Sequence, residues 1–454
     1  MRLDVGNLVT RATETTPEEE AWLAGFLTYE DERAGSTRLF SWTATEFPAG
    51  LTDLVARAAA DEGLRCEVMD RRPRVGGPVE ALLTAAPWGW LYDFQRAACD
   101  AALRAGRGVI EVPTGGGKGE CAIALALAVP VPWLFVVHRA HLVRDVAARW
   151  ERRYGVAPVV LMDGMPKEPP RFALATFQWL HRHLRHPAVR AVLGAVQGLV
   201  VDEAHVQPAS TFMEVSAALP NAYYRLGLSG TPFDRADGRS IVGVSMLGPR
   251  VYRIEARTLI DLGLLAEPVI TMVEHQHPPA PGADWHALED RLIVDSVERN
   301  ALVVRLVEAA DKPCVCFFHR ERHGRNLLRA LRASRLRVVL VNGKSSPQAR
   351  EKAQQAVRDG DVDVLLASGV FQEGVDLPEL RDVVNAGGWA AAIPALQKLG
   401  RGTRSRNKAG ETVKTSFRLL DVYDRGNRIL EGHAAARAHA YRGRGHRVTV
   451  GPVT

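Results

Sequence analysis

The chain has 454 residues, more than one hydrophobic core usually serves, and we expect two or three domains. Its 46% hydrophobic and 24% charged residues are typical of a soluble globular protein, and no apolar run approaches the roughly 20 residues of a membrane span, which excludes a membrane partner. The formal net charge of +6 permits nucleic acid as a partner without requiring it.

Cysteine usage and the first residues indicate the compartment. The five cysteines lack any Cys-x-x-Cys spacing, so neither a disulfide framework nor a zinc site is expected. The start of the chain, with Asp4 and three glutamates at 18–20, has neither the basic start nor the apolar core of a signal peptide. We therefore expect a cytoplasmic protein in a reducing environment.

Short runs rich in valine, leucine and isoleucine alternate with helix-forming segments twice along the chain, which is typical of parallel sheets with crossover helices. Residues 1–88 lack this alternation and predict a small accessory domain of α+β type, with DNA binding as its candidate role. The predicted order is then an α/β lobe at 89–262, a connecting segment with a proline-rich stretch at 263–300, a second α/β lobe at 301–430, and a basic helix and tail at 431–454.

The first motif is a phosphate-binding loop. Residues 112–120 read Val-Pro-Thr-Gly-Gly-Gly-Lys-Gly-Glu between an apolar strand and a helix, which lets backbone N–H groups at the helix start cradle phosphate. The glycines allow close approach of an anion, and the lysine supplies a charge for the outer phosphates. The candidate nucleotide-binding residues are Pro113, Thr114, Gly115, Gly116, Gly117, Lys118, Gly119 and Glu120.

The second motif is an apolar strand that ends in two carboxylates, Leu-Val-Val-Asp-Glu-Ala-His at residues 199–205. After a P-loop in the same lobe, this pattern fits a Walker B site. Asp202 would hold Mg²⁺, and Glu203 would polarise the attacking water. The two motifs together predict ATP and Mg²⁺ as cofactors.

Further motifs follow in order, at residues 91–95, 136–142, 175–178, 227–232, 342–344, 367–369, 372–378 and 397–404. With the P-loop and the Asp-Glu-Ala-His segment, they make residues 90–424 similar to a superfamily 2 helicase of the DEAH-box type. The resemblance implies a P-loop NTPase fold with two tandem RecA-like parallel-sheet lobes, and ATP bound between them.

The resemblance also implies roles for single residues. Tyr92 and Gln95 belong to the segment that reads adenine, and Gly374 and Asp376 would face the nucleotide. The expected catalytic residues are Lys118, Asp202, Glu203, His205, Gln397 and two arginine fingers, Arg401 and Arg404, whose spacing of three points both the same way from a helix. The residues expected to contact nucleic acid are His138, Arg139, Thr176, Gln178, Arg235, Asn342, Gly343, Lys344, Ser368 and Gly369.

Residues 231–238 most resemble the branch that contains repair helicases of the XPB type and bacteriophage recombination helicases of the UvsW type. Members of that branch act on duplex and branched DNA without reading its sequence. The expected function is an ATP-dependent helicase or translocase that remodels duplex, forked or branched DNA in repair or recombination. RNA is the alternative substrate, and accessory protein subunits are further expected partners.

One residue departs from the P-loop pattern. Gly119 stands where a serine or threonine hydroxyl normally binds Mg²⁺. The chain is then either a nucleotide-gated DNA-binding scaffold with weak or no hydrolysis, an active enzyme in which water and Asp202 hold the ion, or a chain with an engineered residue. The motor subunit of a restriction or defence complex is a further alternative. We favour an active ATPase, because Mg²⁺ readily keeps water ligands and Glu203 is retained.

Overall fold

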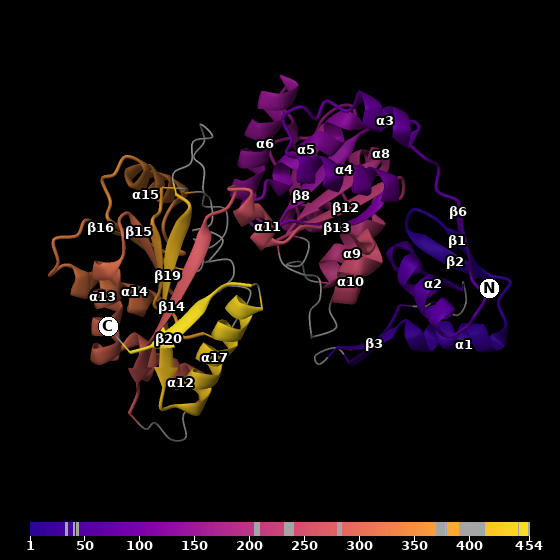
Figure 1. Ribbon diagram of the computed structural model, residues 1–454. Coiled ribbons are helices and arrows are strands. Elements are labelled where there is room, and N and C mark those ends of the chain that lie inside the picture. The colour runs from indigo at the N-terminus through magenta and orange to yellow at the C-terminus, as the bar shows by residue number, and fades with distance from the viewer. Residues whose placement is uncertain are drawn as a thin grey trace. The chain divides into compact units, whose positions relative to one another are not determined.

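The computed structural model describes residues 1–31, 35–39, 41, 45–203, 209–230, 240–278, 284–368, 377, 379–389, 414–443 and 445–452 (Figure 1). The chain divides into two units, one of residues 1–113 and 117–254 and the other of residues 255–454 with 114–116. Among the described residues, none of the helices combines the length and apolar character needed to cross a membrane.

The N-terminal part of the first unit is a small α+β fold. Its sheet has the order β5-β2-β1-β6 and consists of β1 (Arg2–Val5), β2 (Val9–Thr13), β5 (Glu46–Pro48) and β6 (Glu67–Asp70). Alternate strand residues such as Leu3 and Ala12 point inward and pack on Leu23 and Val55 of α1 (Pro17–Phe26) and α2 (Thr52–Asp61). A two-stranded ribbon of β3 (Thr28–Asp31) and β4 (Gly35–Arg38) completes this part.

This α+β part packs directly on the first parallel sheet of the same unit. The short helix η1 (Ala49–Leu51) lies against α10 (Ser240–Leu247), where a side chain at Gly50 would collide with the carbonyl oxygens of Val244 and Ser245. The guanidinium of Arg107, on the first strand of that sheet, donates to the carbonyl of Asn7 at 2.7 Å. The accessory part is therefore fixed to its neighbour by packing and by hydrogen bonds.

The first lobe is built on a seven-stranded parallel sheet of order β13-β7-β12-β11-β8-β10-β9. Most of its strands are buried along their whole length, as strands covered by helices on both faces require. The strands are β7 (Arg107–Glu111), β8 (Trp133–Val137), β9 (Val159–Val160), β10 (Phe172–Thr176), β11 (Gly198–Asp202), β12 (Tyr224–Ser229) and β13 (Arg250–Arg253). The helices are α3 (Val79–Ala85), α4 (Asp93–Ala105), α5 (Lys118–Ala128), α6 (Ala140–Tyr154), α7 (Phe177–His183), α8 (Pro187–Ala195), α9 (Ala209–Ala217) and α10.

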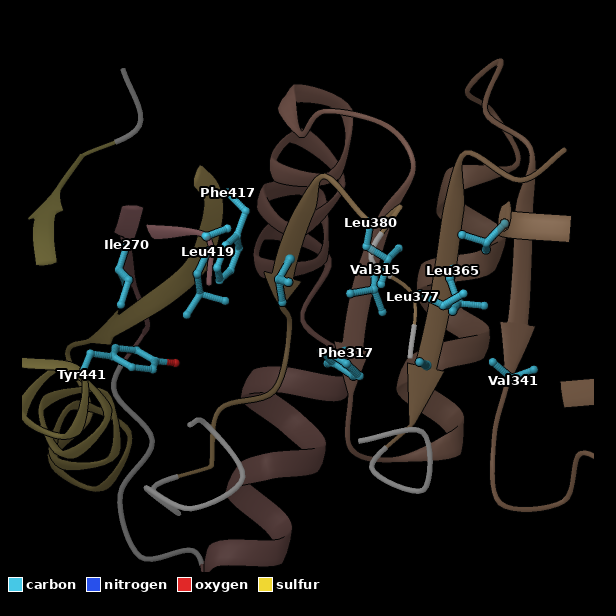
Figure 2. Close-up of a cluster of buried hydrophobic side chains, with 14 of the residues drawn as sticks. Ile270, Val315, Phe317, Val341, Leu365, Leu377, Leu380, Phe417, Leu419 and Tyr441 are labelled. Atoms are coloured by element: carbon cyan, nitrogen blue, oxygen red, sulfur yellow. The ribbon is translucent and has the colours of Figure 1, made fainter. Parts of the chain in front are cut away.

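The second lobe repeats this architecture with the sheet order β16-β17-β15-β18-β19-β14-β20, again parallel throughout. Figure 2 shows the apolar side chains gathered on one face of this sheet, among them Ile270, Phe317 and Leu365. The strands are β14 (Glu267–Gln276), β15 (Cys314–Phe318), β16 (Val338–Val341), β17 (Val364–Ser368), β18 (Asp382–Asn385), β19 (Ser416–Arg425) and β20 (Val448–Gly451). The helices are α11 (Ala256–Asp261), α12 (Trp285–Leu288), the π-helix η2 (Glu289–Val294), α13 (Val297–Ala309), α14 (Glu321–Leu331), α15 (Pro347–Arg358) and α17 (Arg428–Arg442).

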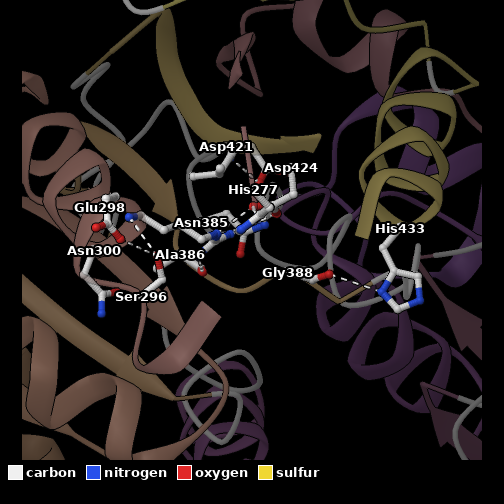
Figure 3. A network of polar contacts seen from close by, with 12 residues as sticks. His277, Ser296, Glu298, Asn300, Asn385, Ala386, Gly388, Asp421, Asp424 and His433 are labelled. Atoms are coloured by element: carbon white, nitrogen blue, oxygen red, sulfur yellow. Dashed lines mark hydrogen bonds and ion pairs between the residues drawn. The ribbon is translucent and has the colours of Figure 1, made fainter. Parts of the chain in front are cut away.

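A buried polar network ties helices of the second lobe to β19 (Figure 3). Arg299 of α13 donates to Asp424 at 2.7 Å, and His277 lies 2.8 Å from the same carboxylate. Arg437 of α17 pairs with Asp421 at 3.0 Å, with both side chains buried. Burial alone would raise the pKa of Asp424, but Arg299 and His277 hold that pKa well below its usual range. Asp424 therefore stays ionised, and the two carboxylates of β19 fix α13 and α17 in place.

The two tandem parallel-sheet lobes expected from the sequence are confirmed, but two segments differ in detail. Residues 263–300, expected to connect the lobes, supply β14, which pairs with β19 along ten residues, and they begin α13. Residues 448–451, expected in a tail, form β20 at the edge of the same sheet. The proline-rich stretch directly after β14 masked the strand, because proline is a strong signal for a loop.

Candidate functional site

The glycine-rich loop has the backbone of an anion site. It leaves the buried strand β7 and enters α5 at Lys118, so the free N–H groups of the first helical turn face the loop. Gly115 and Gly117 have φ of +90° and +81°, a region that residues with a side chain rarely occupy. The loop can therefore wrap closely around phosphate.

Gln95 lies against this loop. It sits in the first turn of α4, where its side-chain oxygen accepts a hydrogen bond from the Tyr92 N–H at 3.0 Å, and only 4% of its surface is exposed. A side chain at Gly117 would collide with the Gln95 amide nitrogen. Tyr92 is 45% exposed and stacks on Phe94, with ring centroids 6.0 Å apart. The structure thus brings Gln95, one of the predicted nucleotide-binding residues, to the P-loop.

Lys118 and the two carboxylates also meet at this loop. Lys118 Nζ lies 3.6 Å from a Glu203 carboxylate oxygen and 3.4 Å from the Val112 carbonyl oxygen. Glu203 has φ of +47°, and its N–H donates to Asp202 at 3.0 Å. Glu203 thus leaves the end of β11 in a left-handed turn, and its carboxylate lies beside the lysine.

The surroundings of the carboxylate pair disfavour the charged form of Asp202. Burial, followed by the neighbouring charge of Glu203, raises the pKa of Asp202 to about 6, while Lys118 opposes that rise. A buried carboxylate beside a second carboxylate is poorly stabilised by a single lysine. The pair is therefore suited to a further cation.

Gly119 faces an arginine that the sequence did not predict to take part. A β-carbon at position 119 would lie 3.0 Å from Nη1 of Arg149 on α6, and beyond its own helix backbone no other atom of the described residues would come within 4 Å. No hydrogen bond or ion pair links the Arg149 guanidinium to any residue in the described ranges. One turn along α6, Arg153 pairs with Glu120 at 3.3 Å and covers the Trp90 ring. The spacing of four residues places Arg149 and Arg153 on one helix face, but it does not predict the contact with Gly119.

The predicted nucleic-acid contacts of the first lobe follow neighbouring strands. His138 and Arg139 come after β8, while Thr176 ends β10 and Gln178 follows in α7. Because β10 and β8 are parallel neighbours, these residues lie at one edge of the sheet. Gln178 is exposed, whereas the Thr176 hydroxyl accepts a hydrogen bond from the Trp179 N–H at 3.3 Å and caps α7.

The predicted contacts of the second lobe are similarly placed. Asn342, Gly343 and Lys344 follow β16, and Ser368 ends its neighbour β17. The Asn342 side chain accepts a hydrogen bond from the Lys344 N–H at 2.9 Å, and Arg350 donates to the Gly343 carbonyl at 3.0 Å. The loop is thus held in one conformation at the edge of the sheet.

Some predicted site residues lie outside the described residues, and their roles stay predictions. They are His205, Arg235, Gly369, Gly374, Asp376, Gln397, Arg401 and Arg404.

Two protein families match the chain. "Type III restriction enzyme, res subunit" matches residues 90–234, and "Helicase conserved C-terminal domain" matches residues 298–406. Together these ranges take in more than half of the chain.

Curated relatives carry helicase and translocase names. "DNA 3'-5' translocase XPB2" of Sulfurisphaera tokodaii is 25% identical over 70% of this chain and 79% of its own length. "DNA 3'-5' helicase XPB" of Mycobacterium tuberculosis is 29% identical over 74% of this chain and 62% of its own length. "ATP-dependent DNA helicase uvsW" of Enterobacteria phage T4 is 25% identical over 48% of this chain and 45% of its own length. The chain therefore spans less than two thirds of the latter two relatives.

Solved structures share the fold. A putative HsdR subunit fragment of a type I restriction enzyme from Vibrio vulnificus has a TM-score of 0.59 at 16% identity, covering 96% of this chain and 81% of that one. Dbp5 of S. cerevisiae, bound to RNA and ADP BeF3, has a TM-score of 0.58 at 15% identity, covering 83% and 94%. These structures share the fold, and the two family matches together with the curated relatives support a superfamily 2 helicase in the branch of the XPB and UvsW proteins.

Proposed function

We propose that the chain is an ATP-dependent DNA helicase or translocase that couples ATP hydrolysis to the remodelling of duplex or branched DNA. The observation that carries the proposal is the group of Gln95, Lys118, Asp202 and Glu203 around one glycine-rich loop. The names of the XPB and UvsW relatives support DNA as the substrate and repair or recombination as the process. A DNA partner also favours an intracellular location.

The residues at the loop fit a nucleotide with a divalent cation. Asp202 and Glu203 offer hard oxygen ligands, and a divalent cation would offset the burial and the neighbouring charge that raise the pKa of Asp202. Asp202 would hold Mg²⁺, directly or through water, and the ion would neutralise charge on the phosphates. Position 119 supplies no hydroxyl, so water is the expected ligand there.

Different residues of the chain would then bind the phosphates, bind the base and accept the proton. The N–H groups at the start of α5 and the Lys118 ammonium hold the phosphates, while Gln95 fixes the base. When phosphate takes up the Lys118 charge, Glu203 loses its 3.6 Å partner and becomes the proton acceptor for the attacking water. We propose Arg401 and Arg404 as the arginine fingers on the basis of the resemblance alone.

ATP turnover with and without duplex DNA, forked DNA and RNA tests the proposal, with Glu203→Gln as the matched control. The expected result is turnover that DNA stimulates and that falls by at least about a hundredfold in the variant. Turnover that stays at the Glu203→Gln level with every substrate would contradict the motor. ATP-dependent DNA binding without phosphate release would instead identify a scaffold.

A motor subunit of a restriction complex is the second candidate. It is favoured by the match of residues 90–234 to the type III restriction family and by the fold likeness to the HsdR fragment. Such a subunit would need a partner with nuclease activity. Co-purification of a nuclease subunit with the native chain, followed by ATP-dependent cleavage of DNA, would support this candidate over a free-standing helicase.

A further inference from the structure

One segment of the second lobe is strongly basic. Residues 320–337 contain seven arginines and one glutamate, a formal charge of +6 that equals the net charge of the whole chain. The rest of the chain is thus close to neutral overall. This segment contains α14 and is separate from the P-loop and its carboxylates.

The helix displays part of this charge along one face. Arg322, Arg325, Arg329 and Arg332 are spaced by three and four residues and are all exposed. At 3.6 residues per turn they fall within an arc of about 80° and extend over about 15 Å. We call Arg325, Arg329 and Arg332 the arginine stripe.

The opposite face of α14 fixes the direction of the stripe. His323 and Leu327 are buried, and His323 Nε2 lies 3.0 Å from the Asn300 side-chain oxygen of α13. Gly324 packs so closely on the Phe318 ring that no side chain would fit. The helix cannot roll without breaking these contacts, so the stripe stays directed to solvent.

Within the described part of the chain, the stripe has no paired carboxylates. Arg322, at the head of the helix, is neutralised by Asp295 at 2.8 Å and Asp290 at 3.2 Å. By contrast, no ion pair joins the stripe to any carboxylate in the described part of the chain, and its one side-chain hydrogen bond runs from Arg329 to Asn326 at 3.4 Å. Three uncompensated guanidinium groups in a row repel one another, which a polyanion would relieve.

We propose that the arginine stripe binds the phosphate backbone of duplex DNA, as a contact surface additional to the loops at the ends of the strands. Guanidinium groups suit phosphate because they donate two parallel hydrogen bonds. An unpaired base needs an aromatic ring on which to stack. Helix α14 contains no phenylalanine, tyrosine or tryptophan, since its sequence is Glu-Arg-His-Gly-Arg-Asn-Leu-Leu-Arg-Ala-Leu. A duplex keeps its bases inside and requires only backbone charge, so it fits the stripe better than a single strand.

The position of α14 explains how the stripe would serve the motor. The helix begins three residues after β15, beside the edge where Ser368 ends β17, and then runs back along the sheet. Its length matches about four base pairs of duplex. The stripe would therefore contact the backbone of a duplex that continues beyond the edge where the strands end. This inference rests on the proposed DNA-remodelling function.

The experiment compares salt dependence of DNA binding for the wild type and two triple variants. The test variant is Arg325→Gln, Arg329→Gln and Arg332→Gln, and the matched control is Arg190→Gln, Arg442→Gln and Arg447→Gln, which removes three exposed arginines from other places. Affinity for a blunt duplex and for a single strand of the same sequence is measured by fluorescence anisotropy between about 50 and 200 mM salt. Basal ATP turnover and thermal unfolding check that both variants fold.

The test variant is expected to lower the slope of log affinity against log salt for duplex by about 2 to 3 and to weaken binding at least about tenfold, more than the control does. Lysine in place of the three stripe arginines should restore most of the slope. Equal slopes for the test and control variants, or an equal loss for single strand and duplex, would overturn the inference. A wild type that binds no DNA would instead refute the proposed function.

Discussion

Adding a hydroxyl at position 119 tests whether the native nucleotide site lacks an essential Mg²⁺ ligand. The change is Gly119→Ser, with Gly119→Ala as the matched control that adds the β-carbon without the oxygen. Gly119 has an ordinary helical backbone, so both residues fit its conformation. Among the described residues beyond its own helix backbone, the β-carbon would meet only the Arg149 guanidinium, at 3.0 Å, and that group ends a flexible side chain with no partner in the described ranges. The site can therefore accept both variants.

The expected gain is small. A serine oxygen would replace one water on Mg²⁺, an exchange of one neutral oxygen for another, and such exchanges change free energies by about 1 kcal/mol. Turnover of Gly119→Ser should therefore stay within about tenfold of Gly119→Ala and of the wild type. Both variants should be slightly more stable than the wild type, because glycine is about 1 kcal/mol less favourable than alanine inside a helix.

The assay is DNA-stimulated ATP turnover at saturating ATP, together with thermal unfolding. A rise of about a hundredfold or more in Gly119→Ser alone would refute the reasoning, since it would show that the native site lacks an essential ligand. An equal loss of nucleotide binding in both variants would point to Arg149, which either β-carbon displaces.

Three further outcomes follow from the geometry. Gly117→Ala should weaken nucleotide binding by at least about tenfold in fluorescence titrations, because it forces φ of +81° on alanine and displaces Gln95; unchanged affinity would contradict the contact. Arg437→Met should lower the free energy of urea unfolding by about 3 to 5 kcal/mol, because it leaves Asp421 buried without its cation; a loss below about 1 kcal/mol would contradict this. Burial lowers the pKa of His323 from 6.5 to about 3, so the unfolded chain takes up a proton first as pH falls below 6.5. Stability should therefore fall by up to about 1.4 kcal/mol per pH unit over that range, and His323→Gln should flatten the profile of urea unfolding against pH; parallel profiles would contradict this.

Local patterns were sufficient to predict the fold and the centre of the site. The strand–glycine–helix order around Lys118 and the strand ending at Asp202 are encoded within a few residues, and the fold brings both to one place. Gln95 lies only 22 residues before Gly117, and its contact with the loop follows from the packing of α4 beside α5.

Long-range packing could not be read from the sequence. The approach of Arg149 to Gly119 depends on how α6 lies beside α5, and no local pattern contains that information. The strand β14 was missed because the prolines that follow it indicate a loop and because its partners, β19 and β20, come about 150 and 180 residues later. The arginine stripe was not predicted because the buried Leu327 and Leu331 lie between its arginines in the sequence. The helix places those arginines on one face.

The most direct test of the account is displacement of a triplex-forming strand from duplex DNA, which requires a motor that moves along the duplex. The account predicts displacement that depends on ATP and is lost in Glu203→Gln, whose carboxylate lies 3.6 Å from Lys118 in the wild type. DNA binding that responds to ATP without any displacement would contradict the central claim.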